Sequence, residues 1–369
     1  MNVSSSVLAT ALVVGSCVLA APAVAAPPAA IACGDTVRGA VVLARDLRCA
    51  TAPGLVLARG ATLDLGGHTL QGPGAGTALP IEWQEPGAES SPVTVVNGTV
   101  RGWGAGLHVE NGRGAVRDVT FDRIAGIGIA VIESDMTIED TTVRRSDVGL
   151  TLFAYGSTTV ARSRFIDNAT AVTAAYSSVV TVEDSTLEGN ATAVECSDAM
   201  AYVARSRLAR NTTAVSFFWC EGSGIQGSEL VRNGTAMRTE PANPSSGSQR
   251  EGDQIFGNRF DRNDVALDLG VNAHLQDNVF TRNGTAFRAL TAGGLLEVGL
   301  FALERNTFNR NGDAVDVDTK IRMRDNVATR NTGWGIHTPA AEDLGGNVAW
   351  GNGREPQCVG VVCTGRPRS

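Results

Sequence analysis

The chain repeats one pattern of apolar and polar positions about every 22 residues. An apolar residue, an Asn three positions later and a small-then-apolar pair recur as F-x-x-N-x-x-A-V, as in the run from Phe165 to Val172. The Asn residues of successive copies are Asn168, Asn190, Asn211, Asn233, Asn263, Asn283, Asn311, Asn331 and Asn352. Within each copy, short runs alternate apolar and polar side chains, which is the period of a β-strand.

A second set of polar residues lies earlier in each copy, about three residues after an apolar position. Its members are Ser163, Ser185, Ser206, Ser228, Asn258, Asn278, Asn306, Asn326 and Asn347. Each copy therefore holds two or three short strands separated by polar corners. At about 3.3 Å per strand residue, one copy closes one coil of a solenoid. The hexapeptide steps of left-handed β-helices are absent, so the sequence predicts an all-β, single-stranded right-handed parallel β-helix of about twelve coils.

The Asn column has an expected physical cause. A sharp corner needs a residue near left-handed helical φ/ψ, which Asn tolerates best after Gly, so we expect the corner Asn residues themselves to adopt it. The amide of each Asn is expected to bond the Asn one coil above, which satisfies polar groups buried at the corner.

The N-terminus predicts export. Residues 1–25 have an apolar run, Val7–Val14, and a small-x-small cleavage site ending at Ala25, although no Lys or Arg precedes the run. Cys17 leaves a lipoprotein signal open as an alternative. The mature domain is expected to span residues 26–369, with caps at 33–49 and 354–369. No later segment is apolar for 18 residues, so we expect no membrane span.

Six Cys remain in the mature chain and fall into three near pairs. An even count in an exported chain favours disulfides. Fifteen connectivities are possible, and free buried thiols are the alternative; proximity alone favours the pairs Cys33 with Cys49, Cys196 with Cys220 and Cys358 with Cys363.

Both ends of the chain carry family-like motifs. The opening Cys33-Gly34-Asp35-Thr36-Val37, with the later Leu63-Asp64-Leu65-Gly66-Gly67-His68-Thr69-Leu70, and the ending 357–363 resemble the caps of secreted actinobacterial parallel β-helix repeat proteins in the pectate-lyase-like superfamily. The resemblance covers about residues 33–363. It implies a groove along one sheet face, walled by long loops. Three stretches exceed a normal coil, namely 77–92, 238–253 and 288–303; tolerated surface insertions are the alternative.

Strand alternation groups the candidate site residues. Positions five and seven past each corner Asn should point outward on one face, in consecutive coils. This places Arg238, Glu240, Asp268, Arg288, Asp316 and Asp318 together, beside two of the long stretches. Asp316 and Asp318 are candidates for acid and base, or for Ca²⁺ ligands, and Asp268 with Arg288 completes the catalytic set. Arg238, Glu240 and Trp83 are candidates for substrate binding, the Arg residues through a uronate carboxylate and Trp83 by stacking on a sugar.

A structural explanation competes with this site. Arg238, Asp268, Arg288 and Asp316 alternate in sign from coil to coil, and such a charge ladder stabilises stacked strands by about 0.2–1 kcal/mol per pair. Asp140, Arg162, Asp184 and Arg205 alternate in the same way elsewhere. The N-T-D, D-D, G-H-G and R-x-K sets of polygalacturonase-like relatives are absent, and the four His are scattered.

Two functions remain open from the sequence. One is binding or processing of an extracellular, acidic polysaccharide by a lyase, hydrolase or epimerase; the other is a non-catalytic secreted or cell-surface scaffold. The net charge of −7, without a basic stripe, excludes a nucleic-acid partner. We expect a secreted monomer.

Overall fold

The computed structural model describes residues 31–82, 91–220, 222–240, 252–270, 272–289 and 301–365. The expected signal peptide, Trp83 and the centres of the three long stretches lie outside the described residues. Within the described ranges there are strands, turns and bends but no helix, and no helix there is long and apolar enough to cross a membrane.

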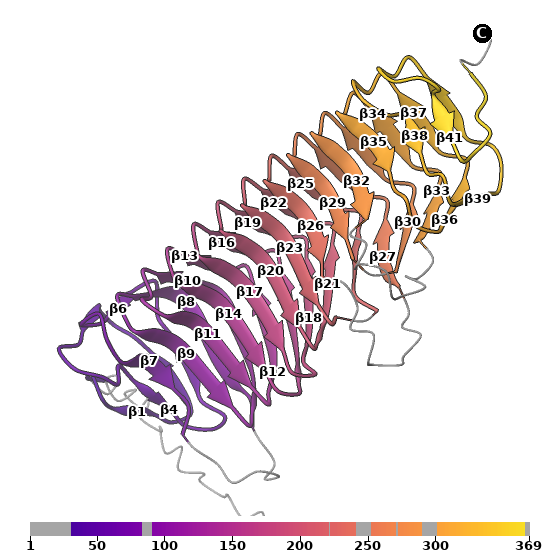
Figure 1. The fold of residues 1–369 in the computed structure, drawn as a ribbon. Coiled ribbons are helices and arrows are strands. Elements are labelled where there is room, and N and C mark those ends of the chain that lie inside the picture. The colour runs from indigo at the N-terminus through magenta and orange to yellow at the C-terminus, as the bar shows by residue number, and fades with distance from the viewer. Residues whose placement is uncertain are drawn as a thin grey trace, which may run out of the picture. The chain divides into compact units, whose positions relative to one another are not determined.

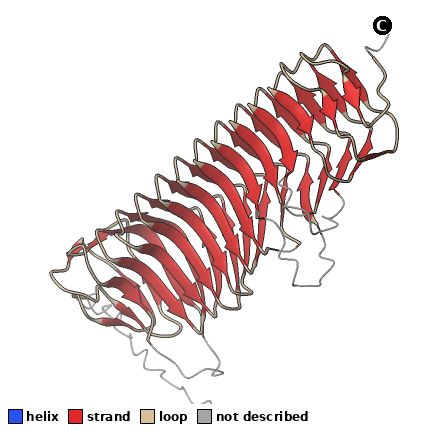
Figure 2. Ribbon diagram, in the orientation of Figure 1, coloured by secondary structure: helices blue, strands red, loops and turns tan. Residues whose placement is uncertain are grey.

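The chain from Ile31 onward winds into stacked coils, and thirteen successive coils each add one strand to a 13-stranded parallel sheet (Figures 1 and 2). Its strands are β7 (Thr77–Pro80), β9 (Ala105–Glu110), β11 (Ile127–Ile132), β14 (Val148–Phe153), β17 (Thr170–Ala175), β20 (Thr192–Ser197), β23 (Thr213–Phe218), β26 (Thr235–Thr239), β29 (Val265–Leu269), β32 (Thr285–Ala289), β35 (Asp313–Asp316), β38 (Ile336–His337) and β41 (Cys358–Val359). Thirteen coils thus confirm the predicted parallel β-helix of about twelve.

Two further parallel sheets close each coil. The second sheet contains β2 (Ala40–Val42), β5 (Thr62–Asp64), β8 (Val93–Arg101), β10 (Arg113–Asp122), β12 (Asp135–Glu139), β15 (Ser157–Ala161), β18 (Val179–Glu183), β21 (Met200–Ala204), β24 (Gly224–Gln226), β27 (Asp253–Phe256), β30 (Ala273–Gln276), β33 (Phe301–Glu304), β36 (Ile321–Arg324) and β39 (Ala341–Asp343). The third contains β3 (Leu47–Arg48), β6 (Thr69–Gln71), β13 (Thr142–Arg144), β16 (Arg164–Ile166), β19 (Thr186–Glu188), β22 (Arg207–Ala209), β25 (Glu229–Val231), β28 (Arg259–Asp261), β31 (Val279–Thr281), β34 (Thr307–Asn309), β37 (Val327–Thr329) and β40 (Val348–Trp350). The long strands β8 and β10 join both sheets, because each pairs with a strand of either one. A short pair, β1 (Thr36–Val37) with β4 (Val56–Leu57), precedes the 13-stranded sheet.

Stacked side chains fill the interior of the coils. Phe260, Phe280 and Phe308 are fully buried and stack nearly parallel, with ring centroids 4.7 and 4.8 Å apart. This distance equals the spacing between paired strands, so each coil sets its aromatic ring on the ring of the previous coil. The small residue of the repeat packs against the large aromatic residue. At Gly149, for example, an added Cβ would lie 2.7 Å from the ring of Phe165.

The corner Asn residues form a continuous buried ladder. Asn190 Nδ2 donates to Oδ1 of Asn211 at 3.1 Å and to the Phe165 carbonyl at 3.1 Å, and the same contacts recur from Asn168 to Asn331. The predicted amide ladder is confirmed. The prediction that the Asn residues take the left-handed conformation is wrong.

The residue before each Asn makes the left-handed bend. Asp167, Arg210 and Arg232 have φ of 57°, 56° and 56°, and Gly stands at the equivalent position 189. These preceding side chains are exposed, whereas the Asn side chains point inward. The reason is geometric. The Asn amide reaches the neighbouring coils from the interior, so the solvent-facing residue before it adopts the left-handed conformation.

Three disulfides form between the pairs favoured by proximity. Cys33–Cys49 and Cys358–Cys363 lie in the first and last coils, where strand edges need covering. Cys196–Cys220 lies in the middle of the solenoid and joins β20 to the residue after Trp219. Three disulfides indicate a non-cytoplasmic location, because thiols stay reduced in the cytoplasm.

Candidate functional site

The predicted charged residues form one column on the outward face of the 13-stranded sheet. Strand register aligns Arg238 with Asp268, Asp268 with Arg288, and Arg288 with Asp316, each pair one coil apart. The register extends this charged column to His337, which is aligned with Asp316. Counting along the repeat misses His337, because the coil after Asn331 has one extra residue before its outward position.

Arg288 and Asp268 bind each other within this column. Arg288 Nε and Nη2 donate to the two carboxylate oxygens of Asp268 at 3.0 and 2.8 Å. The bond to Asp268 raises the pKa of the Arg288 guanidinium above its usual value. Both oxygens of Asp268 therefore accept hydrogen bonds from Arg288.

Asp316 is bound by the neighbouring histidine. His337 Nδ1 lies 2.8 Å from Asp316 Oδ1, and the Trp334 ring stacks on the imidazole with centroids 4.5 Å apart. The Arg354 guanidinium lies over the Trp334 ring, 5.2 Å from its centroid. Asp318 follows β35 and is exposed.

Of the residues predicted to bind substrate, the structure describes Arg238 and Glu240. Arg238 forms an ion pair with Glu240 two residues along the chain, so its charge is also partly matched. Trp83 lies outside the described residues. Trp103, the other Trp near the first coils, is fully buried and donates its indole N–H to the Leu70 carbonyl at 3.1 Å, which makes it a packing residue.

The column does not form a cation site. No group of three or more His, Cys, Asp or Glu side chains in the described ranges is placed to hold a metal ion. Ca²⁺ requires six to eight oxygen ligands, and the oxygens of Asp268 and one oxygen of Asp316 are held by Arg288 and His337. The described residues therefore do not fit a bound Ca²⁺.

The second set of alternating charges shows the same pairing on another side of the coil. Arg162 binds Asp140, Arg205 binds Asp184 at 2.9 Å, and Arg305 binds Asp277 at 2.8 Å. The hydrogen bond from Arg205 lowers the pKa of Asp184, and that from Arg305 lowers the pKa of Asp277. Alternating ion pairs are thus a general feature of these coils.

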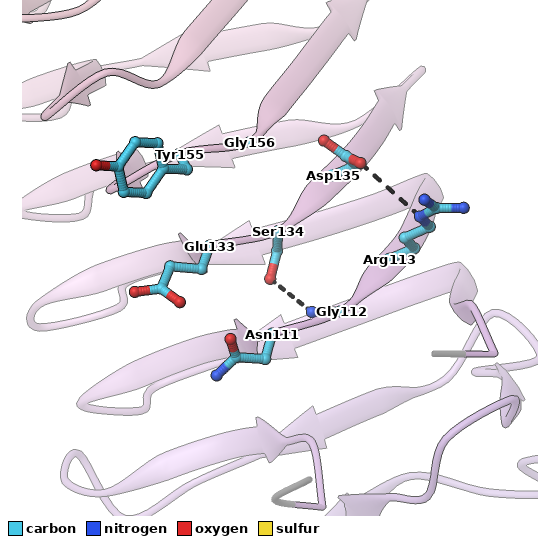
Figure 3. Close-up of a pocket in the computed structure, with 8 residues that line it drawn as sticks. All are labelled: Asn111, Gly112, Arg113, Glu133, Ser134, Asp135, Tyr155 and Gly156. Carbon is cyan, nitrogen blue, oxygen red and sulfur yellow. Dashed lines mark hydrogen bonds and ion pairs between the residues drawn. The ribbon is translucent and has the colours of Figure 1, made fainter. Parts of the chain in front are cut away.

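A polar pocket of about 260 Å³ lies at the edge of the 13-stranded sheet, far along the chain from the charged column (Figure 3). It opens between three successive coils at the corners after β9, β11 and β14, and it is lined by Asn111, Gly112, Arg113, Glu133, Ser134, Asp135, Tyr155 and Gly156. Sequence reasoning missed it, because these residues belong to weak copies of the repeat and share no motif.

The floor of this pocket is fixed by hydrogen bonds. Ser134 Oγ accepts the Gly112 N–H at 2.9 Å and donates to the Ile132 carbonyl at 2.6 Å. Arg59 donates to the Asn111 carbonyl at 2.9 Å. The side chains of Asn111, Glu133 and Tyr155 also line the pocket, and Arg113 forms an ion pair with Asp135 there at 3.8 Å.

Residues 87–214 match the family model described as "Right handed beta helix region". The match agrees with the parallel coils and gives their hand. No curated protein sequence matches the chain.

The chain is similar to several solved structures. The catalytic unit of a GH87 α-1,3-glucanase from Streptomyces thermodiastaticus aligns with a TM-score of 0.51 at 15% identity, over 81% of this chain and 65% of that one. The periplasmic alginate epimerase AlgG gives 0.33 at 10% identity, over 89% and 77%, and pectate lyase Pel9A gives 0.29 at 15%, over 84% and 73%. The chain spans less than two thirds of the glucanase unit, and the similarity concerns the fold.

Proposed function

We propose that the protein is exported and binds a polysaccharide on the outward face of its 13-stranded sheet, without cleaving it. The main support is that the charged side chains of the column bind one another. Arg288 occupies both oxygens of Asp268, and His337 occupies one oxygen of Asp316. Acid–base cleavage needs a proton donor and acceptor free to reach the scissile bond, whereas recognition needs only a long, regular surface.

The fold suits an extended polymer. Thirteen parallel strands repeat outward positions at about 4.8 Å steps, so a chain lying along the axis meets equivalent positions in successive coils. Two of the structures named above are described as a glucanase and a pectate lyase, which act on such polymers. The column Arg238, Asp268, Arg288, Asp316 carries as many negative as positive charges, so it gives an acidic polymer no electrostatic advantage.

Affinity gel electrophoresis against a panel of soluble polysaccharides tests this proposal, combined with assays for new reducing ends and for unsaturated products. The panel contains neutral glucans and xylan, with alginate and polygalacturonate as acidic members. We expect retardation by at least one polymer and no product. If none of the polymers retards the protein, the proposal is contradicted. The remaining alternative is then a non-catalytic scaffold that binds a different kind of partner.

Catalysis is the second candidate, and one observation favours it. His337 and Asp316 form a hydrogen-bonded pair on the surface, with the exposed Asp318 on the same strand side. Such a pair can take up and return a proton. If any polymer of the panel is turned over, Asp316→Ala and His337→Ala should abolish product formation while the exposed control Asp264→Ala leaves it unchanged.

A further inference from the structure

Exposed aromatic side chains gather along one edge of the 13-stranded sheet, at the ends of its strands. Phe153 ends β14, Tyr155 lies two residues beyond it, Tyr176 directly follows β17, and Phe218 and Trp219 stand at the end of β23. Their exposed fractions run from 39% for Phe218 to 71% for Tyr155. We call these five residues the aromatic edge. Large apolar rings left in contact with water in one patch mark binding surfaces more often than single exposed residues do.

Four of the five rings in the aromatic edge form two pairs. Phe153 and Tyr176 form one ring pair with centroids 4.7 Å apart, and Phe218 and Trp219 form a second with centroids 4.5 Å apart. The Tyr176 N–H bonds the Ser197 carbonyl, and the Asp198 N–H bonds the Phe218 carbonyl. Tyr176 and Trp219 therefore occupy the same corner two coils apart, a separation of about 10 Å along the axis.

The polar pocket continues this edge toward the N-terminus. Tyr155 belongs to both, because it lines the pocket beside Glu133 (Figure 3) and its N–H bonds the Tyr176 carbonyl at 3.2 Å. From Asn111 to Trp219 the corner runs through six successive coils, about 24 Å. A polar pocket followed by two pairs of rings is thus one continuous surface.

Local structure does not require aromatic residues at these corners. Tyr155, Tyr176 and Trp219 have φ of 37°, 53° and 55°, in the left-handed region that bulky residues rarely adopt. Other coils place Asn111 and Asp198 at this corner, with φ of 51° in both. The corner therefore forms without a ring, and the rings add surface chemistry instead.

A disulfide holds the second ring pair in place. Cys220 follows Trp219 directly and is bonded to Cys196 of β20, one coil away. This is the disulfide in the middle of the solenoid, distant from both caps. A corner fixed in this way presents Phe218 and Trp219 with little conformational freedom to lose on binding.

We propose that the aromatic edge and its pocket bind a neutral polysaccharide of gluco-configured pyranose rings. Such rings have all ring hydroxyls equatorial, so their axial C–H bonds form apolar faces that pack on aromatic rings. Their rims of hydroxyls can bond Asn111, Glu133 and the Tyr155 hydroxyl in the pocket. Glu133, Asp135 and Asp198 outnumber Arg113 among the charged residues of the pocket and the corner, which disfavours a polyuronate and leaves a neutral chain unaffected. This inference rests on the proposed binding function and names its ligand class and location.

The test measures binding of the folded protein to laminarin, mixed-linkage β-glucan and xylan by affinity gel electrophoresis, with alginate and polygalacturonate as acidic comparisons. Tyr176→Ala and Trp219→Ala should each weaken binding to the polymer that retards the wild type by roughly tenfold, as central aromatic contacts do. Tyr176→Phe and Trp219→Phe keep a ring and should retain most of the affinity. Tyr202→Ala is the matched control, since Tyr202 is a similarly exposed ring, 38% accessible, on β21 of the second sheet. Thermal unfolding of each variant checks that it is folded.

The outcomes separate this inference from the function on which it rests. A wild type that binds a polymer, with Tyr176→Ala and Trp219→Ala equally retarded, overturns the aromatic edge alone. Retardation by alginate or polygalacturonate but by no neutral polymer also overturns it, while polysaccharide binding stands. A wild type that no polymer retards overturns both. Loss of binding in Tyr202→Ala as large as in Trp219→Ala places the ligand elsewhere and contradicts the inference.

Discussion

Arg288 reaches across one coil to hold both carboxylate oxygens of Asp268, at 3.0 and 2.8 Å. The two side chains are partly exposed, 48% for Arg288 and 14% for Asp268. Such an ion pair contributes only about 0–1 kcal/mol to the free energy of unfolding. Its main consequence is that two candidate catalytic groups are engaged with each other.

Arg288→Met should therefore have small effects. We expect chemical denaturation to show a loss of about 0.5–1 kcal/mol in the free energy of unfolding, and unchanged retardation by polysaccharide. Arg207→Met is the matched control, because Arg207 binds Glu229 at 2.8 Å on the third sheet. A complete loss of a measurable activity in Arg288→Met alone would show that the column is catalytic.

Asn211→Ala should be far more damaging, because Asn211 is buried. Its Oδ1 accepts the Asn190 N–H at 2.9 Å, and its Nδ2 donates to the Leu187 carbonyl at 3.1 Å. Removing the amide leaves the buried Asn190 N–H without a partner and takes one hydrogen bond from the Leu187 carbonyl, which costs about 1–3 kcal/mol. The exposed neighbour Thr212→Ala should change the free energy of unfolding by less than about 0.5 kcal/mol. Equal effects of the two variants would contradict a stabilising ladder.

Because of Asp253, we expect the free energy of unfolding to fall as pH rises. Its carboxyl is 3% exposed inside the coil, and burial raises its pKa well above the usual value. The raised pKa means that the neutral form is stable when folded, so its contribution is full below pH ~4, the unfolded pKa, and is lost as pH rises toward the folded pKa. Asp253→Asn should remove this slope and be more stable than wild type at pH 8, by about 1 kcal/mol or more. Denaturation midpoints of both proteins from pH 4 to pH 8 that stay parallel would refute this.

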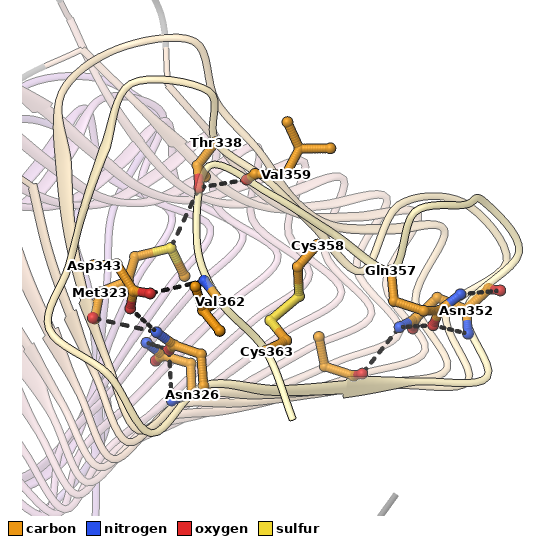
Figure 4. The surroundings of a disulfide bond; sticks show 12 residues. Met323, Asn326, Thr338, Asp343, Asn352, Gln357, Cys358, Val359, Val362 and Cys363 are labelled. Atoms are coloured by element: carbon orange, nitrogen blue, oxygen red, sulfur yellow. Dashed lines mark hydrogen bonds between the residues drawn. A yellow bond between two sulfur atoms is a disulfide. The ribbon is translucent and has the colours of Figure 1, made fainter. Parts of the chain in front are cut away.

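For Asp343, in the C-terminal cap, we expect the opposite pH dependence of the free energy of unfolding. It accepts the Val362 N–H at 2.7 Å and the Gly345 N–H at 2.9 Å, beside the Cys358–Cys363 disulfide (Figure 4). These bonds lower the pKa of its carboxyl, so its contribution is present above pH ~4 and is lost as pH falls through the lower folded pKa. Asp343→Asn should lose about 1 kcal/mol at pH 7 and show little loss at pH 2. A loss of equal size at both pH values would mean that the charge is not involved.

The repeat made most of the fold predictable. Counting from the corner Asn residues gives the correct outward positions from Thr173 to Asp316, because each of these coils uses the same number of residues between corner and strand. The same count fails at His337, where one residue is added. It also misassigned the left-handed bend, since sequence spacing cannot tell which of two adjacent corner residues turns outward.

The aromatic edge could not be predicted from the sequence. Tyr176 and Trp219 are 43 residues apart, follow no shared motif and stand where other coils have Asn or Asp. Only the strand register brings them to one corner, and only burial shows that Trp103 is internal while Trp219 is exposed. The catalytic roles assigned from the sequence to Asp268, Arg288, Asp316 and Asp318 stay predictions.

Hydrogen–deuterium exchange of the wild-type protein, with and without the neutral glucan that retards it most, tests most directly where the ligand lies. We expect slower exchange in peptides that cover residues 153–156, 175–177 and 217–220, at the edge of the 13-stranded sheet. Protection confined to peptides of the third sheet, or to the coils of Arg288 and His337, would contradict it.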